Sequence, residues 1–273
     1  MVAPFKYMLE LFQYSFFVNA LLAGILASIV CGIIGSFIVV KKISFISGSI
    51  AHSSFGGIGL AYFLGWNPVL SAFIFAILSA LSIGVVSRKN KKQEDTIIGA
   101  VWAIGMAIGL FFIYLTPGYS SDLFSYLFGN ILLVSNFDIL LMVILNVFII
   151  GSVVLFFRWF VSLIFDEEFS RVNGIKTFSI YLFLLSLIAM SVIVLMKSVG
   201  IILVIALLTL PAATAQLLSR KFVNIIYLAI IFSLIFNIVG LIVSFYLNIP
   251  SGPIIIFVAA IFYLIAWFTK LKK

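Results

Sequence analysis

The chain has 273 residues, of which 65% are hydrophobic and 9% are charged, and its formal net charge is +8. This balance excludes a soluble globular domain and is typical of a polytopic membrane protein. The basic residues stand in short clusters between long apolar runs, so they report membrane topology and do not indicate nucleic-acid binding.

Long apolar runs predict an all-α bundle of about nine transmembrane helices, within a range of eight to ten, because each span needs roughly 20 residues. The predicted spans cover residues 16–40, 50–66, 69–87, 97–116, 138–158, 178–196, 199–218, 222–247 and 253–269. The first run continues well past the h-region of a secretory signal, so it is expected to remain as a span. We expect residues 1–273 to form one transmembrane domain in the lipid bilayer.

The distribution of Lys and Arg predicts the orientation of the bundle. With the N-terminus outside and the C-terminus in the cytoplasm, fourteen basic residues face the cytoplasm, and only Lys6 and Lys197 face outward. The opposite orientation would reverse this asymmetry, against the positive-inside rule. The chain is therefore predicted to be a multi-pass protein of the cell membrane with its RKNKK loop in the cytoplasm.

Three connections differ from simple turns. The outer segment 117–137 is too polar to span the membrane, and it is expected to form either a short interfacial helix or a structured loop. The inner segment 166–176, DEEFSRVNGIK, carries a dense group of charges. The outer turn 248–253, NIPSGP, is rich in residues that break helices.

The inner segment contains the signals of a short self-capped helix. Asp166 can serve as the N-cap, and Glu167 and Glu168 favour the first turn. Arg171 suits the last turn, and Gly174 can take the left-handed position that follows a helix. A solvated loop between two spans is the alternative interpretation.

The stretch ISGSIAHSSFGGIG, residues 46–59, contains His52, the single histidine of the chain. Its neighbours form two rows at helical spacing: Gly48, His52 and Gly56, and beside them Ser49, Ser53, Gly57 and Ala61. Small residues in such rows let helices approach closely, and Gly105 and Gly109 form a further pair. An ionisable group at membrane depth usually faces a cavity, a pathway or a partner. A neutral, hydrogen-bonded packing histidine is the alternative.

Several chemistries are excluded by what the sequence lacks. No G-x-x-x-x-G-K-[ST] loop occurs, so the chain does not bind ATP as P-loop proteins do. With one histidine and no His/Glu cluster, an intramembrane metalloprotease is excluded, and no enzymatic activity is expected. No Asp, Glu, Lys or Arg lies near the middle of a predicted span, so uphill transport would draw its energy from another subunit.

Five stretches, in this order, resemble the permease subunits of zinc and manganese ABC importers. They are GSFIVVKKISFISGSIAHSSFGGIGLA (35–61), SDLFSYLFGNILLVS (121–135), DEEFSRVNGI (166–175), VGIILVIALLTLPAATAQLLS (199–219) and NIVGLIVSFYLNIPSGPIII (237–256). The resemblance implies a permease homodimer, a cytoplasmic ABC ATPase dimer and an extracytoplasmic solute-binding protein that delivers the metal. It implies no permanently bound cofactor, since the divalent metal, zinc or manganese, is the cargo.

The same resemblance implies roles by position. The stretch 166–175, which includes Phe169, corresponds to the coupling helix that docks on the ATPase. Pro211 lies in a pore-side helix, where it is expected to introduce a kink. His52 has the position of a family histidine on the metal pathway, and Ser49 and Ser53 are neighbouring candidates.

One position departs from the family pattern. The family has an Asp four residues before this histidine, whereas the present chain has Gly48. Mn²⁺ prefers carboxylate oxygens and Zn²⁺ accepts nitrogen more readily, so the departure favours zinc over manganese. The predicted function is therefore a divalent-metal ABC permease. The alternatives are an ABC permease for a metal chelate such as a siderophore or cobalamin, and a stand-alone secondary transporter or channel.

Overall fold

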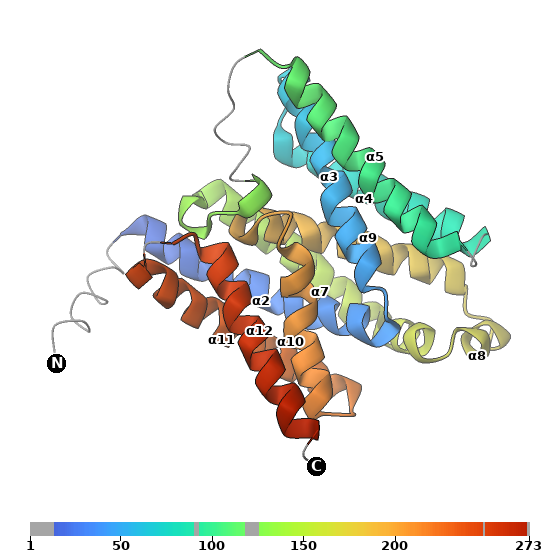
Figure 1. Ribbon diagram of the computed structural model, residues 1–273. Coiled ribbons are helices and arrows are strands. Elements are labelled where there is room, and N and C mark those ends of the chain that lie inside the picture. The colour runs from blue at the N-terminus through green and yellow to red at the C-terminus, as the bar shows by residue number, and fades with distance from the viewer. Residues whose placement is uncertain (1–13, 90–92, 118–125, 248, 272–273) are drawn as a thin grey trace, which may run out of the picture.

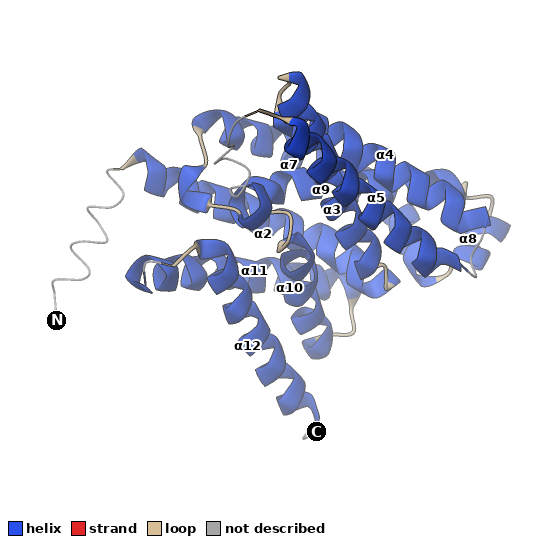
Figure 2. Cartoon of the chain, turned by 45° about the horizontal axis from the view of Figure 1, so that its top comes forward, coloured by secondary structure: helices blue, strands red, loops and turns tan. Residues whose placement is uncertain are grey.

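The computed structural model describes residues 14–89, 93–117, 126–247 and 249–271 of the chain. Within these ranges the regular elements are all helical, as predicted (Figure 2). In chain order they are α2 Ser15–Lys41, α3 Ser44–Leu64, α4 Pro68–Lys89, α5 Glu94–Leu115, η2 Ile131–Leu133, α7 Asn136–Phe165, α8 Glu167–Val172, α9 Thr177–Val199, α10 Val204–Leu218, α11 Phe222–Leu247 and α12 Ser251–Leu271.

Each of the nine predicted apolar runs coincides with a helix, but the predicted number of spans is too high. Among the described residues, seven helices are long and apolar enough to cross a membrane, and α3 and α10 are the two that do not qualify. α10 has 15 residues, which gives roughly 22 Å against a hydrocarbon core of ~30 Å. α3 has 21 residues, but its Gly and Ser content lowers its apolar character.

Glycine explains the short α10. The sequence predicted a span over 199–218, whereas α9 continues to Val199 and Gly200 follows with a φ of 86°. Such a backbone conformation ends the helix and favours glycine. Leu203 N–H then donates to the Gly200 carbonyl, and α10 begins only at Val204.

α7 begins at a capping box and extends beyond its predicted bounds. Ser135 Oγ accepts a hydrogen bond from the Asp138 backbone, and the Asp138 carboxylate accepts one from Ser135 N–H at 3.0 Å, which completes a capping box. The helix runs for 30 residues to Phe165, past the predicted end at 158.

The helices form two outer groups joined by a central one (Figure 1). α3, α4 and α5 pack together on one side, and α10, α11 and α12 pack together on the other. Between them, α9 contacts α4 and α7, while α2 contacts α7, α10 and α11. Cys31 lies within α2 and is fully buried.

The described part of the outer segment packs on the junction between α9 and α10. Ile201 N–H donates to the Tyr126 carbonyl at 3.0 Å, and Ile202 N–H donates to the Leu127 carbonyl at 3.2 Å. Gly129 has a φ of 71°, and its backbone lies against the backbone around Gly200 with no room for a side chain on either residue. This part contains a helical stretch at residues 126–128 and the short helix η2. Residues 118–125 lie outside the described residues, so an interfacial helix there stays a prediction.

Candidate functional site

His52 lies within α3 and is buried, with 8% of its surface exposed. Its ring stacks on the indole of Trp102 from α5, with ring centroids 4.2 Å apart and an angle of 11° between the planes. The Nδ1 atom is buried and has no hydrogen-bond partner. Buried polar atoms are normally hydrogen-bonded, so a buried Nδ1 without a protein partner is unusual for a packing histidine.

Ser49 and Ser53, the two hydroxyls predicted to lie near His52, are also buried. Ser49 Oγ donates to the Ile98 carbonyl of α5 at 2.8 Å, which fixes α3 to α5 one turn before the histidine. Ser53 Oγ donates to the Ile50 carbonyl of its own helix at 3.0 Å. Both hydroxyls therefore lie on the same helix as His52. Each donates its hydrogen to a backbone carbonyl, and the lone pairs of its oxygen remain available as acceptors or ligands.

The contact between α3 and α5 depends on glycines. A Cβ at Gly105 would overlap the Cα and Cβ atoms of Ser53, and a Cβ at Gly109 would overlap Phe55. The predicted small-residue pair in this span thus packs directly on the His52 helix. This close approach brings Trp102, one turn before Gly105 on α5, onto the imidazole.

Gly48 precedes His52 by one helical turn and faces α10. A Cβ at this position would lie 2.8 Å from Ile205 Cδ1 and 3.6 Å from Trp102 Cζ3. A larger side chain at position 48 would therefore meet an aliphatic and an aromatic side chain. At Gly48, where the sequence departs from the family pattern, Ile205 and Trp102 are the neighbouring side chains.

Carboxylates do not assemble around His52. Across the described ranges, no group of three or more His, Cys, Asp or Glu side chains is arranged to hold a metal ion. His52 is the strongest ligand that α3 offers, and a metal held there would draw further ligands from water, hydroxyls or a second chain.

The predicted caps of the inner segment are confirmed. Asp166 Oδ1 accepts a hydrogen bond from Phe169 N–H at 2.8 Å, and Glu167 and Glu168 occupy the first turn of α8. At the other end Gly174 has a φ of 78°. Its N–H donates to the Arg171 carbonyl, while Ile175 N–H donates to the Ser170 carbonyl, both at 3.1 Å. These two bonds form a Schellman motif.

α8 is tied to α2 and α7 by polar contacts. Lys41 Nζ donates to the Leu163 carbonyl at 2.9 Å and lies 3.6 Å from Glu167 Oε2. The other oxygen of Glu167 lies 3.5 Å from Arg171, and Ser170 Oγ contacts Ser162 Oγ at 2.5 Å. Side chains on the outer face are free of the bundle, since Phe169 is 63% exposed and Val172 is 87% exposed.

The end of the bundle next to α8 is rich in charge. A cavity of about 300 Å³ lies there, with walls from the α2–α3 junction, the end of α4, the start of α5, α8 and α9. Its charged lining residues are Lys41, Lys42, Arg88, Glu94, Asp95 and Glu167. The α2–α3 connection, the ends of α4 and α5 that face each other in sequence, and α8 were predicted to lie on one side of the membrane. The structure brings them together at one end of the bundle. Which compartment this end faces stays a prediction.

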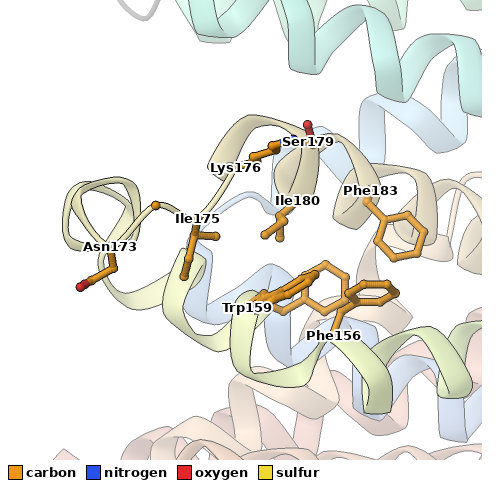
Figure 3. Close-up of a pocket in the computed structure, with 10 residues that line it drawn as sticks. Phe156, Trp159, Asn173, Ile175, Lys176, Ser179, Ile180 and Phe183 are labelled. Atoms are coloured by element: carbon orange, nitrogen blue, oxygen red, sulfur yellow. The ribbon is translucent and has the colours of Figure 1, made fainter.

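A second hollow lies between α7 and α9 beside the end of α8 (Figure 3). It has a volume of about 610 Å³, and Phe156, Trp159 and Phe183 contribute aromatic walls. Asn173, Gly174 and Lys176 line its mouth. The turn that ends α8 thus borders open space, and a Cβ at Gly174 would meet no atom within 4 Å.

Pro211 lies inside α10 and is buried. Because proline has no N–H, the hydrogen bond to the Leu207 carbonyl is missing; the kink stays a prediction.

Trp102 is a residue next to His52 that the sequence analysis did not identify. A signal was present, because positions 102, 105 and 109 share one helix face with the predicted glycine pair.

The fold defines a multi-pass membrane protein. One helix bundle contains both α3, which carries the buried His52, and α8, which is capped at both ends and exposed. Residues 13–270 match the family model of the ABC 3 transport family. The chain belongs to this family. It is therefore a transport component of the cell membrane rather than an enzyme, as the sequence predicted.

Relatives match over nearly the whole chain. An uncharacterized membrane protein of Synechocystis is 42% identical over 97% of this chain and 94% of its own length. The manganese transport system membrane protein MntC of Listeria monocytogenes is 36% identical over 96% of this chain and 94% of its own. The solved structure of PsaBC from Streptococcus pneumoniae in complex with Fab has a TM-score of 0.87 and 30% identity, covering 98% of this chain and 95% of that one.

Proposed function

We propose that this chain is the permease of an ABC importer that moves a divalent metal ion into the cytoplasm, and that His52 is a ligand on the metal pathway. The observation that carries this proposal is the buried, unpartnered Nδ1 of His52 within a helix of small residues. A neutral imidazole nitrogen is a good ligand for Zn²⁺, while a packing histidine would satisfy that atom. The relative named for manganese transport supports a metal as cargo.

We favour zinc over manganese as the cargo. His52 supplies nitrogen, and no carboxylate lies one turn away because position 48 is glycine. Mn²⁺ prefers oxygen ligands, so a site with one imidazole, hydroxyls and water suits Zn²⁺ better. Two copies of the chain in a homodimer would bring two such histidines to one pathway and complete a sparse, low-affinity site that also permits release.

The energy for transport would come from a separate cytoplasmic ATPase that receives α8. This role is supported by the shape of α8, which is fixed by its own caps and exposes Phe169 and Val172. Apolar side chains exposed on a helix at the aqueous end of a bundle are suited to burial in a partner's cleft. An extracytoplasmic solute-binding protein would deliver the metal to the opposite end.

Uptake of zinc and manganese by cells that carry the complete transporter tests the proposal. His52→Ala should lower metal uptake roughly tenfold or more, the loss typical when a metal site is disrupted. Ser54→Ala is the matched control, because Ser54 is equally buried on α3 and bonds only to its own helix. Membrane abundance of both variants should equal that of the wild type. Near-normal uptake by His52→Ala would reduce His52 to a packing residue.

A further inference from the structure

The residues that touch the metal-pathway histidine are unusual for a metal site. The imidazole is covered on one face by the Trp102 indole at a centroid distance of 4.2 Å. A parallel stack leaves the ring nitrogens, whose lone pairs lie in the ring plane, uncovered by the indole. The stack therefore restricts the orientation of the imidazole without blocking its lone pair.

Trp102 also faces position 48. A Cβ at Gly48 would lie 3.6 Å from the indole atom Cζ3, and 2.8 Å from Ile205 Cδ1 on α10. The first distance is ordinary van der Waals contact, whereas the second requires Ile205 to move. A side chain at position 48 would therefore meet Ile205 and Trp102 in the space next to His52.

One turn after the histidine, α3 also packs closely on α5 and α4 at Gly56. A Cβ at Gly56 would lie 2.8 Å from the Gly105 carbonyl and 3.1 Å from the Phe75 ring. The nearest hydroxyls, Ser49 and Ser53, are neutral and already donate to carbonyls. The immediate surroundings of the imidazole thus contain aromatic, aliphatic and neutral groups.

We infer that Trp102 is a specificity-determining residue: it holds the His52 ring in place and, with Ile205, limits the space beside position 48, so that the pathway selects zinc over manganese. This inference rests on the proposed role of His52. Nitrogen ligands suit Zn²⁺, and Mn²⁺ prefers the carboxylate oxygens that this wall does not supply. Trp102 acts through His52 and does not itself bind the metal.

Competition in the complete transporter measures this selectivity directly. Zinc uptake is recorded at increasing manganese, and the manganese concentration that halves it is compared between variants at matched membrane abundance. Trp102→Leu should lower zinc uptake by roughly threefold to tenfold, the range expected for loss of an aromatic pair. It should also make manganese a stronger competitor. Trp102→Phe, which keeps a stacking ring, should restore both values.

Two further variants provide a control and a second test of manganese competition. Trp159→Leu, on α7 and remote from α3, should leave the competition unchanged. The double change Gly48→Asp and Ile205→Ala supplies the carboxylate and the room for it, and should make manganese compete more strongly than Gly48→Asp alone does.

The outcomes separate this inference from the proposed function. Unaltered manganese competition in Trp102→Leu, or a wild type in which manganese competes as well as zinc, would overturn the selectivity role. If His52→Ala takes up metal normally, the proposed pathway itself is wrong. A third outcome is that metal uptake requires His52, while manganese competition is unchanged in both Trp102→Leu and the double variant. The role of His52 on the pathway would then stand, and only the role of Trp102 would be wrong.

Discussion

The helix that carries His52 and the helix capped by Asp166 are held in place by opposite means. α8 has six residues, and both of its ends are fixed by hydrogen bonds from neighbouring positions in the chain. α3 has 21 residues and is buried along most of its length against α4 and α5. The comparison shows that local sequence can determine an exposed element, whereas a buried element depends on partners far away in the chain.

Two glycines illustrate the difference. Gly174 after α8 has a φ of 78° and open space around it, so its requirement is conformational. Gly105 on α5 has no such backbone angle, but a Cβ there would overlap the backbone of Ser53. Glycine is therefore needed at Gly174 because of its positive φ, and at Gly105 because two helices approach closely there.

The largest effect is expected at the α3–α5 contact. Gly105→Ala should destabilise the protein by about 3 kcal/mol, because the added methyl group meets backbone that cannot rotate away. Gly99→Ala on the same helix is the control, since no atom lies within 4 Å of a Cβ there. Thermal unfolding in detergent would measure both. Equal stability of the two variants would show that α3 does not depend on this close packing.

A smaller effect is expected at the end of α8. Gly174→Val should cost about 2 kcal/mol locally, because a β-branched residue is strongly disfavoured at positive φ. We expect normal membrane abundance together with lost ATPase association or lost stimulation of ATP hydrolysis. Gly174→Asn should retain both, since Asn tolerates the left-handed conformation. Full stimulation with valine would mean that this segment is only a loop.

The smallest effect is expected at the start of α8. Asp166→Ala removes the side chain that accepts from Phe169 N–H and should destabilise the helix by about 1 kcal/mol. Asp166→Asn keeps an accepting oxygen and should lie close to wild type. Stimulation of ATP hydrolysis by the purified complex is the measurement. A loss as severe as that of Gly174→Val would contradict the view that the two caps contribute separately.

What the sequence could predict follows the same division. The caps at Asp166 and Gly174 were readable because each depends on residues within a few positions. The long apolar runs likewise predicted where helices lie. The length of α10 was overestimated because Gly200 was read as part of an apolar run, although its backbone ends a helix.

The contacts of the site were less accessible from sequence. The partners of His52 are Trp102 on α5 and, through position 48, Ile205 on α10, and nothing in the spacing of α3 indicates either. The face shared by Trp102 and Gly105 placed the indole on the packed side of α5. It did not reveal that α3 would be the helix opposite, because pairing between helices is decided by packing over the whole bundle.

Burial of Cys31 has a practical consequence for chemical labelling. Aqueous maleimides react with accessible thiolates, and this sulfur lies in a side chain with no exposed surface in α2. The native protein therefore provides an unreactive background, and a reporter cysteine can be introduced without first replacing Cys31. Exposed positions such as Trp66 and Asn173, which the predicted topology places on opposite faces of the membrane, can then test that prediction in an otherwise unaltered protein.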